Sequence, residues 1–225
     1  MLSRFNIDLI LNCDQASGKL AFMLKLIPNI LTFARLVLTV VFLVMLFYCP
    51  RVDAPNRSLF LDVAFAVFVI AGVTDLVDGP IARRLNVASK FGRMMDPLAD
   101  KALVCGAFIC FAIIGEPKLF NLPEVSLKVI LWLVAAVILA REIFVTTLRH
   151  IAEARGVDFP ATVSGKIKMF LQSFAVGTVL IKAAHVQTAY WGYWFTTVVF
   201  ALMLMVTVVS GLMATHRTSW KRVKG

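Results

Sequence analysis

The sequence is poor in charged side chains, which make up 16% of its 225 residues, whereas they make up about a quarter of a typical soluble domain. Its four cysteines show no C-x-x-C and no metal-ligand spacing. It contains no internal repeat and no basic soluble segment, so nucleic-acid binding is not expected. Residues 1–28 lack an apolar stretch followed by a small-residue cleavage site, so no cleavable signal peptide is expected either.

What the sequence has instead is apolar residues, at 60% of the chain. They fall in blocks of about 20 residues, the length that crosses a hydrocarbon core of about 30 Å. A soluble protein with unusually apolar helices is the alternative, and the regular block length argues against it. We therefore predict an all-α integral membrane protein whose six transmembrane helices form one domain over residues 29–214. The blocks cover residues 29–49, 59–77, 97–115, 125–148, 167–183 and 190–214.

The basic residues are distributed unevenly between the two sides that six spans would define. Fifteen of the 23 Lys and Arg lie on the side that carries both termini, and four lie in the opposite loops. The positive-inside rule then predicts that both termini are cytoplasmic, and we expect the protein in the cell (inner) membrane. We expect residues 1–28 to be a cytoplasmic segment with a short interfacial helix over 17–27. Residues 215–225 form a basic cytoplasmic tail suited to anionic membrane lipids.

Four aspartates, and no glutamate, border the second and third apolar blocks. Asp75 and Asp78 are three residues apart, and Asp96 and Asp100 are four apart, so each pair shares one face of a helix. Pro97 suits the first turn of the third helix, where a missing N–H costs nothing. Two consecutive helices joined by a short loop can therefore bring the four carboxylates together.

Clustered carboxylates repel one another unless a cation lies between them. Oxygen ligands without His or Cys favour Mg²⁺ or Mn²⁺. Two such ions suit displacement at phosphorus, where they align the attacking and leaving oxygens. Gly79 and Ala82 extend the Asp75–Asp78 face with little bulk, which leaves room for a ligand. The alternative, ordinary loop carboxylates or helix caps, does not account for two matched pairs.

The same stretch contains the pattern D-x₂-D-G-x₂-A-R-x₈-G-x₃-D-x₃-D, and it resembles the CDP-alcohol phosphotransferase family. That family has six transmembrane helices with the site at the cytoplasmic side, and the resemblance covers nearly the whole chain. It also implies a homodimer. The eight fixed positions are Asp75, Asp78, Gly79, Ala82, Arg83, Gly92, Asp96 and Asp100.

By this resemblance, Asp75 and Asp96 would bridge two Mg²⁺ (or Mn²⁺) ions, with Asp78 on one ion and Asp100 on the other. Asp100 would also act as the general base that takes the proton of the acceptor hydroxyl. The resemblance implies further residues that bind the CDP-lipid, two of them at the entry to the first helix. These residues are Asn29, Thr32, Gly79, Ala82, Arg83, Ser89 and Gly92.

Three cations in the second half of the chain point to a phosphorylated acceptor. Arg141 and Arg149 are eight residues apart, on nearly the same helix face, and Lys166 opens the fifth span. Glu142 adjoins Arg141 but lies about 100° away on a helix, so we expect it to be a poor partner. These cations facing one cytoplasmic cavity would bind a phosphate group. The alternative for Arg149 and Lys166 is the positive-inside pattern itself.

This combination resembles the phosphatidylglycerophosphate synthase branch of the family. It implies transfer of a phosphatidyl group from CDP-diacylglycerol to the 1-hydroxyl of sn-glycerol 3-phosphate, in phospholipid biosynthesis. Serine, inositol phosphate or phosphatidylglycerol are alternative acceptors. An intramembrane prenyltransferase would carry its two aspartate motifs far apart, whereas both pairs here fall within 26 residues. An ion-coupled transporter, from a different class, would place its carboxylates near the midplane, often within inverted repeats.

Overall fold

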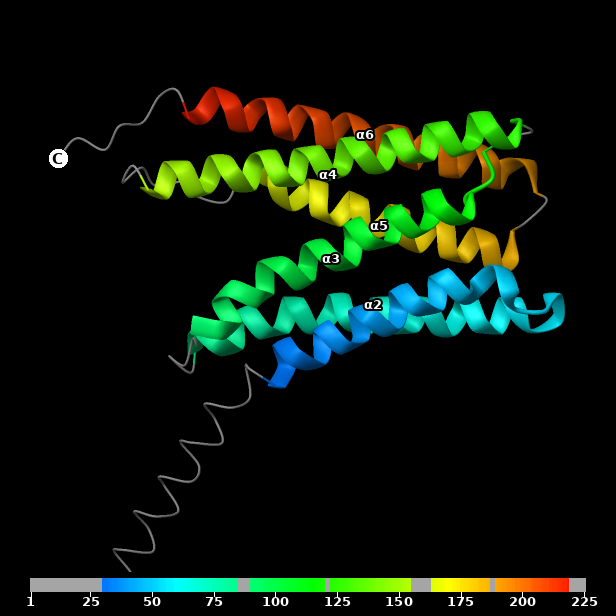
Figure 1. The fold of residues 1–225 in the computed structure, drawn as a ribbon, viewed down its shortest axis with the longest axis horizontal. Coiled ribbons are helices and arrows are strands. Elements are labelled where there is room, and N and C mark those ends of the chain that lie inside the picture. The colour runs from blue at the N-terminus through cyan, green and yellow to red at the C-terminus, as the bar shows by residue number, and fades with distance from the viewer. Residues whose placement is uncertain (1–29, 85–89, 120–121, 155–162, 187–188, 219–225) are drawn as a thin grey trace, which may run out of the picture. The chain divides into compact units, whose positions relative to one another are not determined.

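The computed structural model describes residues 30–84, 90–119, 122–154, 163–186 and 189–218, and these ranges contain helices and no strand (Figure 1). Within them, the side chains of residues 54, 75–84, 90–100, 153, 163, 164, 166 and 216–218 lie outside the description. The expected interfacial helix over 17–27 and the basic tail fall outside the described ranges almost entirely.

Each predicted apolar block corresponds to one described helix. The first helix covers residues 30–48 and ends in the short 3₁₀ turn η1 (Cys49–Arg51). Five further helices follow: α2 (Ala54–Arg84), α3 (Lys90–Ile114), α4 (Glu124–Ala154), α5 (Val163–His185) and α6 (Tyr190–Thr218). In the described part of the chain, five helices are long and apolar enough to cross a membrane. The chain is therefore a multi-pass membrane protein.

The helices around the aspartate motif are longer than the apolar blocks that predicted them. Helix α2 continues seven residues past the predicted end at 77, and α3 begins at Lys90, seven residues before 97. Pro97 is therefore the eighth residue of α3, and its expected place in the first turn was wrong. Hydropathy detects only the part of a helix that lies in hydrocarbon, so the polar turns that continue α2 and α3 escaped it.

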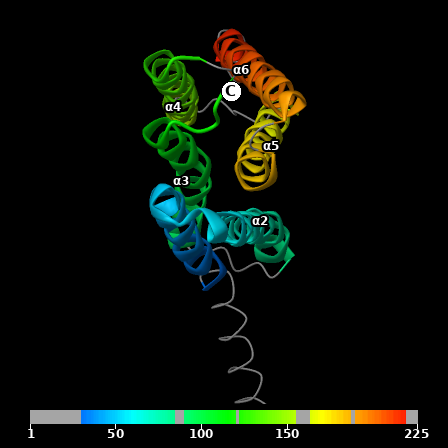
Figure 2. The same cartoon turned by 90° about the vertical axis from the view of Figure 1, so that its right-hand side faces the viewer.

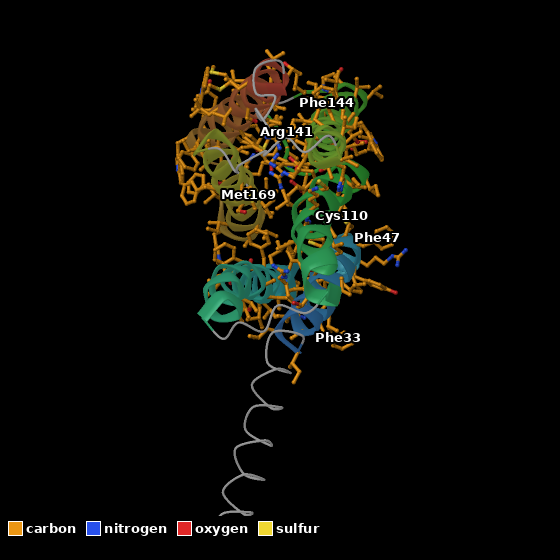
Figure 3. All side chains as sticks on the ribbon, turned by 90° about the vertical axis from the view of Figure 1, so that its left-hand side faces the viewer. Phe33, Phe47, Cys110, Arg141, Phe144 and Met169 are labelled. Carbon is orange, nitrogen blue, oxygen red and sulfur yellow. The ribbon has the colours of Figure 1, made fainter. Side chains whose placement is uncertain are left out.

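The chain divides into two units, and the first consists of Met1–Val40 and Phe68–Asp100. Its part of the first helix buries a polar stripe at i, i+3 and i+7, formed by Thr32, Arg35 and Thr39. The Thr39 hydroxyl donates to the Arg35 carbonyl oxygen at 2.9 Å. Phe33 lies on the exposed side of the same helix (Figure 3). This helix thus turns its polar side inward and its apolar side outward, as expected in lipid.

The second unit consists of Val41–Val67 and Lys101–Gly225, and α6 packs against both α4 and α5 within it (Figure 2). Aromatic rings join the helices: Phe108 of α3 meets Phe200 of α6 with ring centroids 5.9 Å apart. Gly177 of α5 faces Phe65 of α2 so closely that an added Cβ would lie 3.2 Å from the ring. These contacts belong to the apolar core of the second unit, and polar side chains lie beyond it.

One of these polar ends joins the start of α2 to the end of α5. The Ser58 hydroxyl donates to the Ala184 carbonyl oxygen at 2.9 Å, and His185 Nε2 lies 2.8 Å from Asp62 Oδ1. Lys182 donates to the Lys118 carbonyl oxygen in the α3–α4 connection. These side-chain hydrogen bonds therefore hold the C-terminal end of α5 against the start of α2 and the α3–α4 connection.

The close approach at Gly177 gives a stability prediction. Gly177→Leu should lower the Tm of the detergent-solubilised protein by about 5 °C, because overpacking between α5 and Phe65 costs about 1–3 kcal/mol. Gly72→Leu is the matched control, since no described atom lies within 4 Å of a Cβ added there. A fluorescence-monitored thermal melt measures both variants, and equal Tm values for the two would contradict the packing.

Candidate active site

The aspartate motif lies on two helices of the first unit. Asp75 and Asp78 belong to α2, and Asp96 and Asp100 belong to α3, so the helical spacing assumed for each pair is present. Asp78 lies six residues before the end of α2 and Asp96 six residues after the start of α3. Both are thus about 9 Å along a helix axis from the connecting residues 85–89. This equal spacing supports the predicted cluster, whose side chains lie outside the description.

The donor set fits a hard divalent cation, because all four side chains offer carboxylate oxygens. Among the side chains that the structure describes, no group of three or more His, Cys, Asp or Glu could hold a metal ion. The motif, which is not among those side chains, stays the predicted metal site.

The predicted CDP-lipid residues are distributed over three helices. Thr32 is buried in the first helix, with 4% of its surface exposed. Gly79, Ala82 and Arg83 are helical positions of α2, and Gly92 is a helical position of α3. Asn29 and Ser89 lie outside the described residues. Their convergence on one ligand therefore remains a prediction.

The second unit contains a charged cluster, and its centre is Glu142. Arg141 Nη1 lies 3.0 Å from Glu142 Oε1, and each of these side chains is 12% exposed. Figure 3 shows Arg141 pointing between α4 and the neighbouring helices, whereas Phe144 lies on the outer side of α4. The expectation that Glu142 is a poor partner for Arg141 was wrong. A 100° offset between positions does not separate two long side chains that both turn toward the interior.

Lys168 of α5 is the second partner of Glu142, and it also donates to Oε1. Only 4% of Lys168 is exposed. Sequence reasoning counted Lys168 among the flanking cations of the positive-inside pattern and so missed it. The available signal was Glu142 itself, since a carboxylate near the end of an apolar helix requires cations from elsewhere in the fold.

Two further helices support the cluster. The Thr146 hydroxyl donates to the Glu142 carbonyl oxygen at 2.6 Å, and Lys101 of α3 donates to the Thr146 hydroxyl oxygen. Gly211 of α6 leaves space for the Arg141 stem, because a Cβ there would lie 3.3 Å from Arg141 Cγ. Four helices of the second unit thus contribute to holding Arg141 and Glu142 in place.

The other two predicted acceptor cations are Arg149 and Lys166. Arg149 is an exposed residue of α4, and the described side chains give it no ion pair. It lies eight residues, or about 12 Å, along the helix from Arg141. Lys166 is a helical position of α5 whose side chain lies outside the description. The structure therefore brings Arg141 together with Lys168, and the roles of Arg149 and Lys166 stay predictions.

The cluster carries two cations and one carboxylate, so its net charge is positive. Arg141 uses one terminal nitrogen on Glu142, and its Nε has no hydrogen-bond partner among the described residues. A guanidinium with donors to spare, beside an ammonium group, is suited to binding an anion such as a phosphate. This end of the second unit can therefore bind a phosphorylated group.

Comparison with known proteins decides the family. Residues 25–209 match the model of the CDP-alcohol phosphatidyltransferase family. The chain belongs to this family. Membership confirms the resemblance carried by the aspartate motif and makes the chain an enzyme of this kind, a membrane-bound transferase.

Individual relatives agree with this membership. A probable phosphatidylglycerophosphate synthase of Mycobacterium tuberculosis is 36% identical over 83% of this chain and 78% of its own length. Two proteins named CDP-diacylglycerol–glycerol-3-phosphate 3-phosphatidyltransferase are similar as well. The Bacillus subtilis protein is 34% identical over 82% of this chain and 91% of its own length. The Rickettsia typhi protein is 36% identical over 70% of this chain and 78% of its own length.

The tight fit of Arg141 against α6 gives a prediction for the enzyme. Gly211→Val should lower CMP release from a CDP-linked lipid about tenfold, because even a Cβ at this position would lie 3.3 Å from Arg141 Cγ and the further methyl groups would displace the Arg141 side chain. Ala201→Val on the exposed side of the same helix is the control and should leave the rate unchanged. Equal rates of CMP release for both variants would show that the reaction does not depend on the position of the Arg141 side chain.

Proposed function

We propose that this chain transfers the phosphatidyl group of CDP-diacylglycerol to the 1-hydroxyl of sn-glycerol 3-phosphate and releases phosphatidylglycerophosphate and CMP. The observation that carries the proposal is the similarity to the Bacillus subtilis transferase named for this reaction, over 82% of this chain and 91% of that protein. The buried Arg141–Glu142–Lys168 cluster supports it, since a phosphorylated acceptor needs cations that a neutral alcohol does not.

The aspartates Asp75, Asp78, Asp96 and Asp100 hold two Mg²⁺ or Mn²⁺ ions in this proposal. Bound there, the ions would supply charge neutralisation for the diphosphate and for the departing CMP. The fit rests on the chemistry of the donor set, four carboxylates placed as two helical pairs at matching distances from one short connection.

The remaining chemistry belongs to the chain's own residues. Asp100 takes the proton of the acceptor's 1-hydroxyl while the hydroxyl oxygen forms a bond to the β-phosphorus of CDP-diacylglycerol. The bond between that phosphorus and the CMP oxygen breaks, and CMP leaves. Arg83 binds the diphosphate, and Gly79 and Ala82 allow the CDP group to approach α2 closely. Asn29, Thr32, Ser89 and Gly92 complete the CDP-lipid site. Arg141, Arg149 and Lys166 bind the acceptor phosphate.

The membrane arrangement in this proposal has six spans, over the domain 29–214, with both termini cytoplasmic in the cell (inner) membrane. Helix α2 supports it, because its 31 residues extend about 46 Å, longer than a hydrocarbon core of about 30 Å. Its last ten residues contain Asp75, Asp78, Arg83 and Arg84, so this end of the helix would project toward the aqueous side. Residues 1–28 would lie along that surface, residues 215–225 would bind lipid headgroups, and two chains would form a homodimer.

A panel of acceptors tests the proposal. Purified protein in detergent is given CDP-diacylglycerol and Mg²⁺ with glycerol 3-phosphate, serine, inositol phosphate or phosphatidylglycerol in separate reactions. CMP should appear with glycerol 3-phosphate and stop when a chelator removes the divalent ion. Release with another acceptor alone would keep the aspartate chemistry and reject the proposed acceptor. Folded protein that releases no CMP with any acceptor would reject the proposal as a whole.

A single substitution tests the general base. Asp100→Asn should reduce kcat with glycerol 3-phosphate about 100-fold or more, because the amide cannot accept the hydroxyl proton. The Tm should change little, and Asp53→Asn, at an exposed position between η1 and α2, should leave kcat unaltered. Near-normal turnover in the folded Asp100→Asn protein would rule out this role.

A further inference from the structure

Glu142 is the only described carboxylate that two cations share through one oxygen. Arg141 of the same helix and Lys168 of α5 both reach Glu142 Oε1. All three side chains are largely buried, in helices that otherwise consist mostly of apolar residues. An arrangement of this kind needs a reason, because buried ion pairs contribute little to stability compared with apolar residues of the same size.

The geometry offers such a reason, since Glu142 fixes the direction of Arg141. One terminal nitrogen of the guanidinium is held at 3.0 Å by the carboxylate. The planar group then has a set orientation, and its buried Nε, without a partner among the described residues, remains as a donor. Gly211 of α6 leaves room for the aliphatic part of the Arg141 side chain, so Glu142 and α6 together position the guanidinium.

The same carboxylate holds Lys168 next to Arg141. The turn that bears Glu142 is itself held, because its carbonyl oxygen accepts from Thr146 and the Thr146 hydroxyl oxygen accepts from Lys101. Two like charges side by side would repel, and the shared carboxylate offsets that repulsion. The result is a pair of cations at a defined separation, which is what recognition of a phosphate requires.

We propose that Glu142 is a positioning residue for the acceptor, and that Lys168 belongs with Arg141 to the set of cations that binds the acceptor phosphate. This inference rests on the proposed function and adds two residues to it. It goes beyond the aspartate motif, which determines the transfer chemistry and contains neither of them.

The sign of the effect separates this role from its opposite. A carboxylate that only competed with the phosphate for the cations would weaken acceptor binding, and its neutralisation would lower the KM for glycerol 3-phosphate. A carboxylate that holds the cations in place strengthens acceptor binding, and its neutralisation raises that KM. The positioning role is favoured because both cations meet the same oxygen, and the Nε of Arg141 has no hydrogen-bond partner among the described residues and can donate to a second anion.

The experiment measures KM separately for each substrate. Glu142→Gln should raise the KM for glycerol 3-phosphate about tenfold and change the KM for CDP-diacylglycerol less than about twofold. Glu142→Asp, which keeps the charge on a shorter stem, should restore part of the loss. Glu124→Gln, at an exposed position in the first turn of the same helix, is the control and should leave both constants unchanged. A purely structural role would instead lower the amount of folded protein or affect both substrates alike.

A double-mutant cycle tests the link to Lys168. Lys168→Met should also raise the KM for glycerol 3-phosphate, and the double variant with Glu142→Gln should show far less than the product of the two single effects, since both remove one shared interaction. If either variant fails to fold in a thermal melt, Glu142→Asp and Lys168→Arg replace them, and both should still raise the acceptor KM.

The outcomes distinguish the two proposals. Wild-type protein that releases CMP with glycerol 3-phosphate, together with Glu142 variants whose KM for it is unchanged or lowered, overturns the positioning role alone. Independent effects of Glu142→Gln and Lys168→Met overturn the membership of Lys168. Wild-type protein that turns over only with an unphosphorylated acceptor overturns the proposed function itself.

Discussion

The constraint on which the structure depends is the cost of charge among apolar helices. A charged group that faces hydrocarbon or a dry helix interface must find a counter-charge or a hydrogen bond, or it destabilises the fold. The second unit meets this constraint between α4 and α5 by placing Glu142 between Arg141 and Lys168. At the other end of α5, Lys182 donates to a backbone carbonyl oxygen and lies 4.1 Å from the centroid of the Tyr193 ring. In both places a buried charged group thus has a partner from another helix or connection.

Hydropathy alone predicted the order of the helices that the structure describes, because a run of about 20 apolar residues has the length of a membrane-spanning helix and exceeds that of most buried helices. It could not predict where α2 ends and where α3 begins, since Asp78–Arg84 and Lys90–Asp96 interrupt the apolar runs with charged residues and are still helical. For the same reason Pro97 was assigned to a first turn that in fact begins at Lys90. The boundaries nearest the motif were thus the least predictable part of the fold.

The candidate site also has one part that the sequence predicts and another that it does not. Spacing within one helix is local, so Asp75 with Asp78 and Asp96 with Asp100 could be paired from the sequence, and the family match agrees with that motif. The pairing of Glu142 with Lys168 joins residues 26 positions apart on different helices, and no periodicity reports it. The pairing with Arg141 depends on side-chain torsions, which position along a helix does not determine. Interactions between helices therefore had to come from the structure.

These two kinds of information correspond to two parts of the proposed reaction. The motif on α2 and α3 contains the carboxylates that the transfer chemistry needs, and it lies in one short stretch of chain. The cations that would recognise the acceptor come from α4 and α5, and their arrangement depends on packing. Lys168 lies on the side of α5 that faces α4, where its ammonium group contacts Glu142. A phosphate site beside Arg141 is consequently built first around Lys168, with Glu142 determining how far apart the two cations stand.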